Sequence, residues 1–378
     1  IDKPRRRRGG CGLGEQEVHN TGAQQACADH IFGLDFIANG AVDQLAAGIS
    51  YQIAGGNYNV NLSYTYDNNG NIASISDGTY TTSYVYDSQN QLIRENNQYA
   101  NKTWTWEYDG AGNILNRKEY AYTTGTLGTR ASTYFYTYDN GAWGDLLIDY
   151  EEQAITYDEI GNMLTRGFNT FTWEHGRELS SMTIGNAEDW RFFYNADGLR
   201  TRRYENNWGK HYTYDYNSSG QLVRMNVRTE DYNGANYYNA TLTFTYDANG
   251  TPLSMTVNYI EYVFEPYYDE YWGYEEWDYM PYYYSGTFYY VTNAQGDVIA
   301  LLNQSGNKVM EYVYDAWGNV ISTTGSMADT IGKYNPFRYR SYIYDPEYGL
   351  YYLQSRYYNP ETGRFLNADA YPSTGQGL

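Results

Sequence analysis

The chain has 378 residues, of which 49 are tyrosine and only 12 are phenylalanine, so its aromatic surface carries many hydroxyl groups. Its net charge of −20 disfavours binding to nucleic acid or to an anionic membrane, because both need a basic protein surface. Cys11 and Cys27 are the only cysteines, which excludes a disulfide framework. No apolar stretch reaches the roughly 18 residues that a membrane-spanning helix needs.

Residues 1–50 differ from the rest of the chain, because they contain the basic run Arg5 to Arg8 and lack tyrosine. We expect a separate, poorly ordered segment whose arginines are solvated rather than a nucleic-acid or sorting patch. Its possible metal ligands are Cys11, His19, Cys27 and His30. Their spacing does not match the paired ligands of a zinc site, so we predict no metal. Because the chain begins at Ile1, we expect a fragment, and the lack of an export signal is uninformative.

A short motif recurs from Tyr51 onward and is clearest in Tyr312-Val-Tyr-Asp-Ala-Trp-Gly-Asn-Val320. Tyr312 and Tyr314 are two residues apart, which places both rings on one face of a strand. Asp315 can accept hydrogen bonds from the backbone of a turn, and Gly318 can adopt the left-handed conformation that closes it. The Tyr-Asp pair recurs at Asp67, Asp87, Asp109, Asp139, Asp158, Asp215, Asp247 and Asp315.

The distance between these turns leaves room for two strands of about six residues in each repeat. A helical repeat would instead show a period of about 3.6 residues, which is absent. We therefore predict an all-β fold, with an array of antiparallel hairpins over residues 51–330. A lone hairpin is marginal in water, so neighbouring hairpins must pair and bury their tyrosine faces.

Residues 258–290 are a tyrosine-rich, acidic insertion, and no lysine or arginine occurs between Thr229 and Asn307. Aromatic rings beside carboxylates suit a basic partner or a sugar. The simpler interpretation, which we prefer, is a long hairpin whose tyrosines pack on its neighbours. Prolines concentrate from Pro266 onward. We expect irregular loops there, because central strands exclude proline.

The sequence contains no motif of a common enzyme class, no phosphate-binding loop and no dinucleotide fingerprint, so we predict no cofactor. The turn at Asp67 resembles part of a calcium loop, but it lacks the glycine position and the distal glutamate of an EF-hand. We interpret it as a turn. His175 and His211 have no nucleophile or metal ligand at a recognisable spacing, and we predict surface or strand histidines.

Asp345 and Asp369 lie in the proline-containing end of the chain rather than among the repeats. Two carboxylates that are brought together share a proton, so that one acts as a base and the other as an acid, as in an aspartic protease. Both residues also suit turns, since Asp345 precedes Pro346 and Asp369 stands in Asn-Ala-Asp-Ala-Tyr-Pro. Spacing alone leaves both alternatives open.

The end of the chain runs from Asn335-Pro-Phe-Arg-Tyr-Arg through Asp345-Pro-Glu-Tyr-Gly to Arg364-Phe-Leu-Asn-Ala-Asp369. This stretch closely resembles the RHS repeat-associated core. The Tyr-Asp-x-x-Gly-Asn units before it resemble RHS/YD repeats, so the resemblance covers residues 51–378. It implies a β-sheet strip wound into a spiralling shell, which the core over residues 331–378 closes.

The resemblance also implies a function. Shells of this family enclose a variable carboxy-terminal toxin or effector, as in polymorphic toxins, Tc-toxin C components and bacterial wall-associated proteins. We therefore expect a protein that is secreted or held at the bacterial cell surface or cell wall, and a toxin cargo that this chain does not contain. In several members the core is an intramolecular aspartic protease, and its two aspartates match Asp345 and Asp369 by motif. Any enzymatic activity is then at most self-cleavage, at a site expected beyond Leu378.

The main alternative is a teneurin-like surface adhesin that binds carbohydrate or a cell-surface protein through exposed hairpins, without proteolysis. A sugar-active enzyme is a third possibility. It rests only on the insertion at residues 258–290, where no pair of carboxylates has a defined role.

The catalytic hypothesis requires Asp345 and Asp369 to approach each other, with Arg338 nearby. In this prediction, Gly349 to Tyr358 runs as one strand and Arg364 to Asp369 returns antiparallel beside it. Two such carboxylates cannot easily both ionise, which would raise the pKa of one of them.

Overall fold

The computed structural model describes residues 32–38, 46–53, 58–139, 141, 144–185, 188–206, 209–230, 236–269 and 274–369. For residues 32–38, 46, 52–53, 188, 230, 236–238, 263–269 and 274–279 it describes the backbone alone. The basic run Arg5 to Arg8 and the four possible metal ligands before residue 31 lie outside the described residues.

In these ranges, 24 strands form one sheet. Strands β1 to β8 are Phe32–Ala38, Ala46–Ile53, Asn59–Tyr66, Ile72–Ser76, Thr81–Tyr86, Leu92–Asn97, Lys102–Tyr108 and Ile114–Ala121. Strands β9 to β16 are Arg130–Tyr138, Leu147–Tyr150, Gln153–Tyr157, Met163–Arg166, Asn169–Glu174, Glu178–Ile184, Glu188–Tyr194 and Arg200–Glu205. Strands β17 to β24 are Lys210–Tyr216, Leu222–Glu230, Asn236–Tyr246, Pro252–Asp269, Tyr274–Thr292, Val298–Asn303, Lys308–Tyr314 and Val320–Thr324.

Each of these strands pairs antiparallel with the next strand along the chain, from β1 to β24. The predicted all-β array of hairpins is therefore confirmed. The sheet also begins earlier than predicted, because β1 and the first half of β2 precede residue 51. Tyrosine content therefore did not mark the start of the sheet.

The turns use the predicted chemistry. At Asp67, one carboxylate oxygen accepts the backbone N–H groups of Asn69 and Asn71 at 2.9 Å each, and the other accepts the Asn71 amide at 2.9 Å. Gly70 donates its N–H to the Asp67 carbonyl and has a φ of 84°, a conformation that glycine adopts without strain. The same bonds recur at Asp109, Asp158 and Asp315. In one repeat the turn begins at Asn217 rather than at the predicted Asp215.

In seven repeats, the tyrosine that precedes the turn joins its hairpin to the one before. The Tyr246 hydroxyl donates to the carbonyl of Leu222, the residue that opens the strand after the preceding turn, at 2.6 Å. Six further tyrosines make the equivalent bond: Tyr86, Tyr108, Tyr157, Tyr194, Tyr216 and Tyr314. The pairing register shifts by a bulge at or next to these tyrosines. Because a bulge increases local twist and bends a strand, its repetition curves the whole strip.

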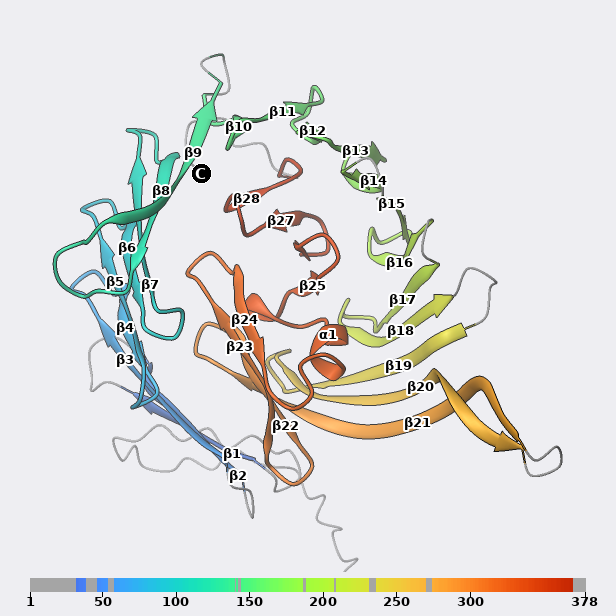
Figure 1. The fold of residues 1–378 in the computed structure, drawn as a ribbon. Helices are drawn as coiled ribbons and strands as arrows, with labels where there is room; N and C mark the ends of the chain where they lie inside the picture. The colour runs from blue at the N-terminus through green and yellow to red at the C-terminus, as the bar shows by residue number, and fades with distance from the viewer. Residues whose placement is uncertain are drawn as a thin grey trace, which may run out of the picture.

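The curved strip forms a ring (Figure 1). Its two ends meet through side chains, since the Tyr51 hydroxyl donates to the Thr292 carbonyl at 2.6 Å and the Ala294 N–H donates to the Tyr64 hydroxyl at 2.9 Å. Near this contact, β6 also meets the turn at residues 314–316. We call the whole contact between the two ends of the strip the seam.

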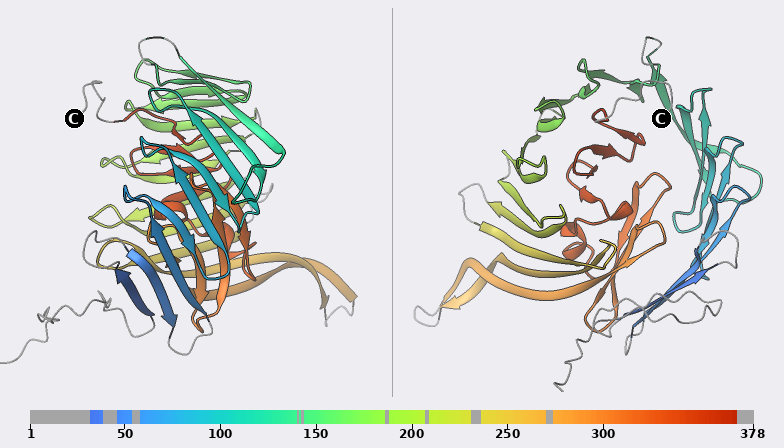
Figure 2. Two further views of the ribbon diagram at one scale, coloured as in Figure 1. Left: turned by 90° about the vertical axis from the view of Figure 1, so that its left-hand side faces the viewer. Right: turned by 180° about the vertical axis from the view of Figure 1, so that it is seen from behind.

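Residues 331–369 lie inside the ring and are named here the inner segment (Figures 1 and 2). Its helices are α1 (Ile331–Tyr334) and the 3₁₀ turn η1 (Tyr339–Ser341), and its strands are β25 (Ile343–Asp345), β26 (Leu350–Tyr352), β27 (Tyr357–Asn359) and β28 (Arg364–Phe365). These four strands form a separate antiparallel sheet in chain order.

The predicted burial of the tyrosine face is confirmed at many positions. Buried tyrosines of the strip are Tyr51, Tyr64, Tyr136, Tyr138, Tyr150, Tyr212, Tyr214, Tyr290 and Tyr312. Tyrosines on the other face are exposed, such as Tyr283 at 75%. The core of the protein therefore fills the space between the ring wall and the inner segment.

The acidic insertion forms the long hairpin of β20 and β21, which extends away from the ring (Figure 1). Pro266 and Pro281 lie within these strands, so the irregular loops expected from Pro266 onward are wrong for this part of the chain. The reason is that β19 pairs with β20 only as far as Glu261, and β22 pairs with β21 only from Phe288. Beyond those points proline is tolerated, because each strand has a free edge among the described residues.

The two histidines of the repeats have ordinary structural surroundings. His175 is exposed and lies 3.0 Å from Glu178. His211, in β17, stacks on Tyr204 of the neighbouring strand β16. Among the described residues, no group of histidine, cysteine or acidic side chains is arranged to hold a metal ion. No helix in the described ranges is long and apolar enough to cross a membrane.

Changing Tyr246 to Phe should destabilise the protein by about 1 kcal/mol, because the Leu222 carbonyl loses its side-chain donor while the ring still packs. The measurement is chemical denaturation of both proteins. Tyr283→Phe, at an exposed tyrosine, is the control and should leave the free energy of unfolding unchanged. Equal effects of the two substitutions would contradict a special role for the tyrosines that precede the turns.

Candidate functional site

The inner segment binds the turns of the ring one after another. Four of its side chains donate to the carbonyl of the left-handed glycine in four different turns: Tyr352 to Gly198, Gln354 to Gly220, Ser341 to Gly296 and Tyr351 to Gly318. Such glycine carbonyls point away from the hairpin ladder and are available to an outside donor. The repeated turn therefore provides a repeated binding site for the inner segment.

Asp345, the first predicted catalytic residue, ends β25 and is 1% exposed. Its carboxylate accepts two bonds from the Arg200 guanidinium, at 2.5 and 3.0 Å, and one from the Tyr348 hydroxyl at 2.6 Å. Arg203 lies 3.2 Å from the same carboxylate. Both arginines belong to β16 in the ring wall, so Asp345 joins the inner segment to the ring through a fully buried ion pair.

Aromatic rings enclose this ion pair. The Arg200 guanidinium lies 4.4 Å from the centre of the Tyr352 ring, and the Arg203 guanidinium lies 3.6 Å from the centre of the Tyr212 ring. Burial alone would raise the pKa of Asp345, but Arg200 and then Arg203 outweigh it and hold this pKa below its ordinary value. Asp345 is therefore ionised at neutral pH, and the expected rise in pKa does not occur at this carboxylate.

Asp369 and Arg338 have other partners. Asp369 follows β28, is about half exposed and forms an ion pair with Arg356 at 3.0 Å. The Arg338 side chain is buried, donates to the Gly332 carbonyl at 3.0 Å and stacks on Tyr344. The ion pairs that the structure shows for Asp345 are those with Arg200 and Arg203.

The path of the chain between the two aspartates differs from the prediction. The single strand expected from Gly349 to Tyr358 is two strands, β26 and β27, joined by a tight turn in which Leu353 donates to the Arg356 carbonyl. This extra turn makes β25 and β28 the two outer strands of the small sheet. Three strand spacings of about 4.8 Å separate outer strands in such a sheet. The predicted antiparallel return of the chain from Arg364 is present, beside β27, but β26 and β27 separate it from β25.

A pattern in the sequence marks Arg200 and Arg203, although the prediction missed it. The residue that opens the strand after a turn is apolar in most repeats, as at Ile114 and Leu222, but it is Arg200 in one. Three residues further on, the bulge brings a second inward position, which holds Met225 in one repeat and Arg203 in another. A charged residue at an inward position predicts a buried partner, because burying an unpaired charge is costly.

The same second position is charged in three other repeats, at Glu95, Arg117 and Arg166. Each of them contacts a distant part of the chain. Arg166 forms an ion pair with Glu361 of the inner segment at 2.8 Å, Arg117 lies 3.6 Å from Asp315, and Glu95 accepts the Ala316 N–H at 2.9 Å. Charged residues at this position therefore mark the contacts that close the ring and fix the inner segment.

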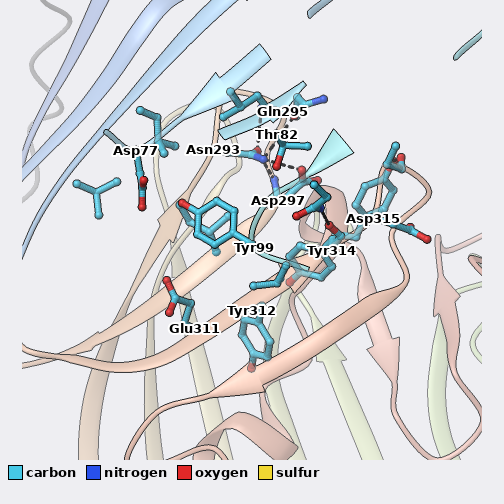
Figure 3. Close-up of a pocket in the computed structure, with 18 of the residues that line it drawn as sticks. Asp77, Thr82, Tyr99, Asn293, Gln295, Asp297, Glu311, Tyr312, Tyr314 and Asp315 are labelled. Carbon is cyan, nitrogen blue, oxygen red and sulfur yellow. Dashed lines mark hydrogen bonds between the residues drawn. The ribbon is translucent and has the colours of Figure 1, made fainter. Parts of the chain in front are cut away.

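A cavity of about 420 Å³ lies along the seam, between β3 to β6 on one side and the turn at residues 293–297, β22 and β23 on the other (Figure 3). In the view of Figure 3, Asp77 and Glu311 lie at one side, Asp315 lies at the other, and Asp297 lies between them. The acids have protein partners: Glu311 pairs with Lys308 at 2.9 Å, and Asp297 accepts the Asn293 amide at 2.7 Å. The buried carboxylates of Asp297 and Asp315 therefore line a cavity at the seam.

Comparisons with known proteins agree with this architecture. The model of the teneurin YD-shell family matches residues 274–375. The tRNA3(Ser)-specific nuclease WapA of Bacillus spizizenii and the tRNA nuclease WapA of Bacillus subtilis are each 31% identical to this chain over 299 residues. Each match covers 78% of this chain but only 11% of the relative, so the chain spans about a tenth of the length of these proteins.

Two further similarities are more distant. The double-stranded DNA deaminase toxin A of Burkholderia cenocepacia is 23% identical over 357 residues, which is 86% of this chain and 22% of that protein. The crystal structure of TcdB2-TccC3-TEV superposes with a TM-score of 0.71 at 20% identity, over 92% of this chain and 17% of that one. The second similarity shows a shared fold. With the Tyr-Asp turns, the tyrosine bonds between hairpins and the enclosed inner segment, these findings place the chain in the RHS/YD-repeat family.

Proposed function

We propose that this chain is part of a bacterial RHS shell that encloses a toxin or effector attached at its carboxyl end. The observation that carries the proposal is the position of the inner segment within the ring. Leu366 and Asn367 are buried there, with the Leu366 carbonyl accepting the N–H of Met163 in the ring wall. A cargo attached after this segment would therefore begin on the inner side of the sheet.

The named relatives support the same proposal. Two are called tRNA nucleases and one is called a DNA deaminase toxin, and this chain matches only a small part of each. The shared part is then the shell, and the activity of this protein resides in a cargo of unknown chemistry. We propose that the protein is secreted or held at the cell surface or cell wall. Its core would be residues 331–378 and its shell the strip up to residue 330, which begins at β1 rather than at residue 51 as expected.

A second part of the proposal is self-cleavage by Asp345 and Asp369, with Arg338 in support. In such a dyad the ionised carboxylate accepts a proton from water, which attacks the peptide carbonyl, while the protonated carboxyl donates to the carbonyl oxygen. Asp345 would be the ionised partner, because Arg200 and Arg203 stabilise its charge. The reaction requires Asp369 to leave Arg356 and approach Asp345 when a peptide is bound.

Self-cleavage is tested in a chain extended past Leu378 by a substrate segment and a reporter domain. Cleavage should occur in the parent and disappear in Asp345→Asn and in Asp369→Asn, as seen by gel electrophoresis and mass spectrometry. Asp67→Asn, in an exposed turn where asparagine serves as well, is the control and should cleave normally.

Asp345→Asn removes a buried ion pair, a change that typically costs about 3–5 kcal/mol, so its fold must be checked by circular dichroism. Asp369 is exposed, and its variant should fold. Normal cleavage in Asp369→Asn would therefore exclude the dyad whatever happens to the Asp345 variant. The enclosing shell would remain, and binding of the protein to a glycan array would then favour the adhesin alternative.

Enclosure is tested by attaching a protease-sensitive reporter after Leu378 and comparing its digestion with that of the free reporter. The attached reporter should be protected, and Gly318→Ala should reduce the protection. A methyl group at Gly318 would lie 2.6 Å from the Tyr339 ring, so the inner segment must move.

Gly78→Ala is the matched control for this substitution. Gly78 has nearly the same φ, 88° against 89°, but no atom lies within 4 Å of the added methyl group. Both variants incur the cost of a left-handed alanine, about 1–2 kcal/mol. Only Gly318→Ala should expose the reporter. Digestion of the attached reporter at the rate of the free one in the parent protein would contradict enclosure.

A further inference from the structure

The seam is held by buried side chains of β6 and β8 that contact the turn after β23. The Glu95 carboxyl accepts the Ala316 N–H at 2.9 Å, and the Asn97 amide donates to the Tyr314 carbonyl at 3.0 Å. Arg117 lies 3.6 Å from Asp315. These bonds connect parts of the chain that are more than 190 residues apart, and they replace the strand pairing that joins neighbouring hairpins elsewhere.

Two buried acids share one cation at this contact. Glu95 is fully buried, Asp315 is 4% exposed, and Arg117 is the arginine that faces both. The turn uses both oxygens of Asp315, which accept the N–H groups of Trp317 and Asn319 and the Asn319 amide. Glu95 also accepts from donors, the Ala316 N–H and the Asn97 amide at 3.0 Å, and burial raises the pKa of both acids, so the hydrogen bonds alone do not separate them. The cation does: Arg117 forms its ion pair with Asp315. The extra proton of the pair is therefore assigned to Glu95.

We propose that Glu95 closes the ring in a proton-dependent way. When its carboxyl is protonated, Glu95 holds the turn at residues 314–316 against β6. When it is ionised, it repels Asp315 and the seam loosens. The proposal concerns the ring itself and does not depend on whether the ring encloses a cargo. Its consequence is that the ring opens at the seam as the pH rises. The cavity of Figure 3 is lined by Asn97, Asp315 and Ala316, so it reaches the contact on the side of Asp315.

The other ionisable groups around the pair do not change charge near neutral pH. They are Arg117 from β8, Tyr84 and Tyr86 from β5, Tyr136 from β9, and Tyr339 and Tyr358 from the inner segment. Burial raises the pKa of each of these tyrosines, and the pKa of Arg117 is also raised, because the charge of Asp315 outweighs the effect of burial. All of them keep one charge state over the range in which Glu95 titrates.

The direction of the pH effect follows from the pKa of Glu95. Burial, and then the charge of Asp315, raise this pKa from an ordinary value of 4.5 to about 8. Because the folded pKa is raised, the stabilising contribution of Glu95 is fully present below about pH 4.5, declines as the pH rises and is lost above about pH 8. The seam should therefore be tightest in acid and weakest in mild alkali.

Asp297 acts in the same direction at the neighbouring contact. It accepts the Arg340 N–H of the inner segment at 2.9 Å, and burial raises its pKa despite the nearby Arg340 side chain. Asp345 acts in the opposite direction, because its pKa is lowered. A rise in pH therefore loosens the seam while the inner segment remains bound to β16.

The test is amide hydrogen exchange of the Ala316 N–H, expressed as a protection factor so that the intrinsic effect of pH is removed. In the parent protein, protection should fall by about tenfold per pH unit between about pH 5 and 8 and level off above pH 8. Glu95→Gln retains an acceptor for the Ala316 N–H and does not titrate. Its protection factor should be independent of pH over the same range.

Two comparisons complete the test. Asp315→Asn keeps the turn, since asparagine already begins the turns at Asn217 and Asn293, and it removes the charge that opposes ionisation of Glu95. Protection should then level off at a lower pH. The Thr251 N–H, which donates to Asp247 at 2.8 Å in a turn away from the seam, is the control amide and should show no such dependence.

Identical pH profiles of Ala316 in the parent protein and in Glu95→Gln would overturn the proposal. It would also fail if the Thr251 amide lost protection in parallel with Ala316, because the pH effect would then be a general loosening of the sheet. If Asp315→Asn left the plateau at pH 8, the two acids would not be coupled, and the proposed repulsion would be wrong.

Discussion

The structure depends on one hydrogen bond that seven of the repeats make to the repeat before them. A tyrosine hydroxyl such as that of Tyr246 crosses from one turn to the carbonyl that follows the previous turn. Since an isolated hairpin is marginal in water, this bond and the strand pairing beside it supply what a single repeat lacks. It also explains why the chain uses tyrosine far more than phenylalanine, because phenylalanine fills the same space but cannot reach a carbonyl.

The same repeat produces the surface that the inner segment binds. Most turns use a left-handed glycine, although Asn90 takes that position in one, and the glycine carbonyl accepts a bond from the inner segment in four turns. The inner segment therefore needs only a hydrogen-bond donor opposite the glycine carbonyl of a turn. Tyr351 and Gln354 are two such donors. A regular scaffold thus holds a segment that is itself irregular, with short strands and tight turns.

Local sequence patterns predicted the features that are set locally. The turn at Asp67 and the strands on either side follow from residues a few positions apart, and the structure confirms them. The tight turn at Leu353 to Arg356 was missed, because Tyr351 and Leu353 alternate as they would in a continuous strand. What divides that strand is its packing inside the ring, with Gln354 bonded to Gly220.

The partners of Asp345 could not be found from spacing for a related reason. Arg200 is 145 residues away, and only the closing of the ring places it beside Asp345. What the sequence does contain is the exception, a charged residue at a position that is apolar in neighbouring repeats. Compared across repeats, Glu95, Arg117, Arg166 and Arg203 stand out in the same way. The repeat itself serves as the internal reference that reveals them.

These charged residues lie at contacts where apolar side chains alone would not determine which strand meets which turn. Apolar side chains bind one another in many registers, so a ring closed by them alone could join at the wrong strand. A buried ion pair is stable only in one geometry, because leaving either charge unpaired is costly. Arg200 with Asp345 and Arg117 with Asp315 therefore determine which turn meets which strand.

The two contacts differ in the sign of their pKa shifts, since Asp345 has two arginines and the Glu95–Asp315 pair has one. The number of cations at each contact thus determines whether acid or alkali weakens it.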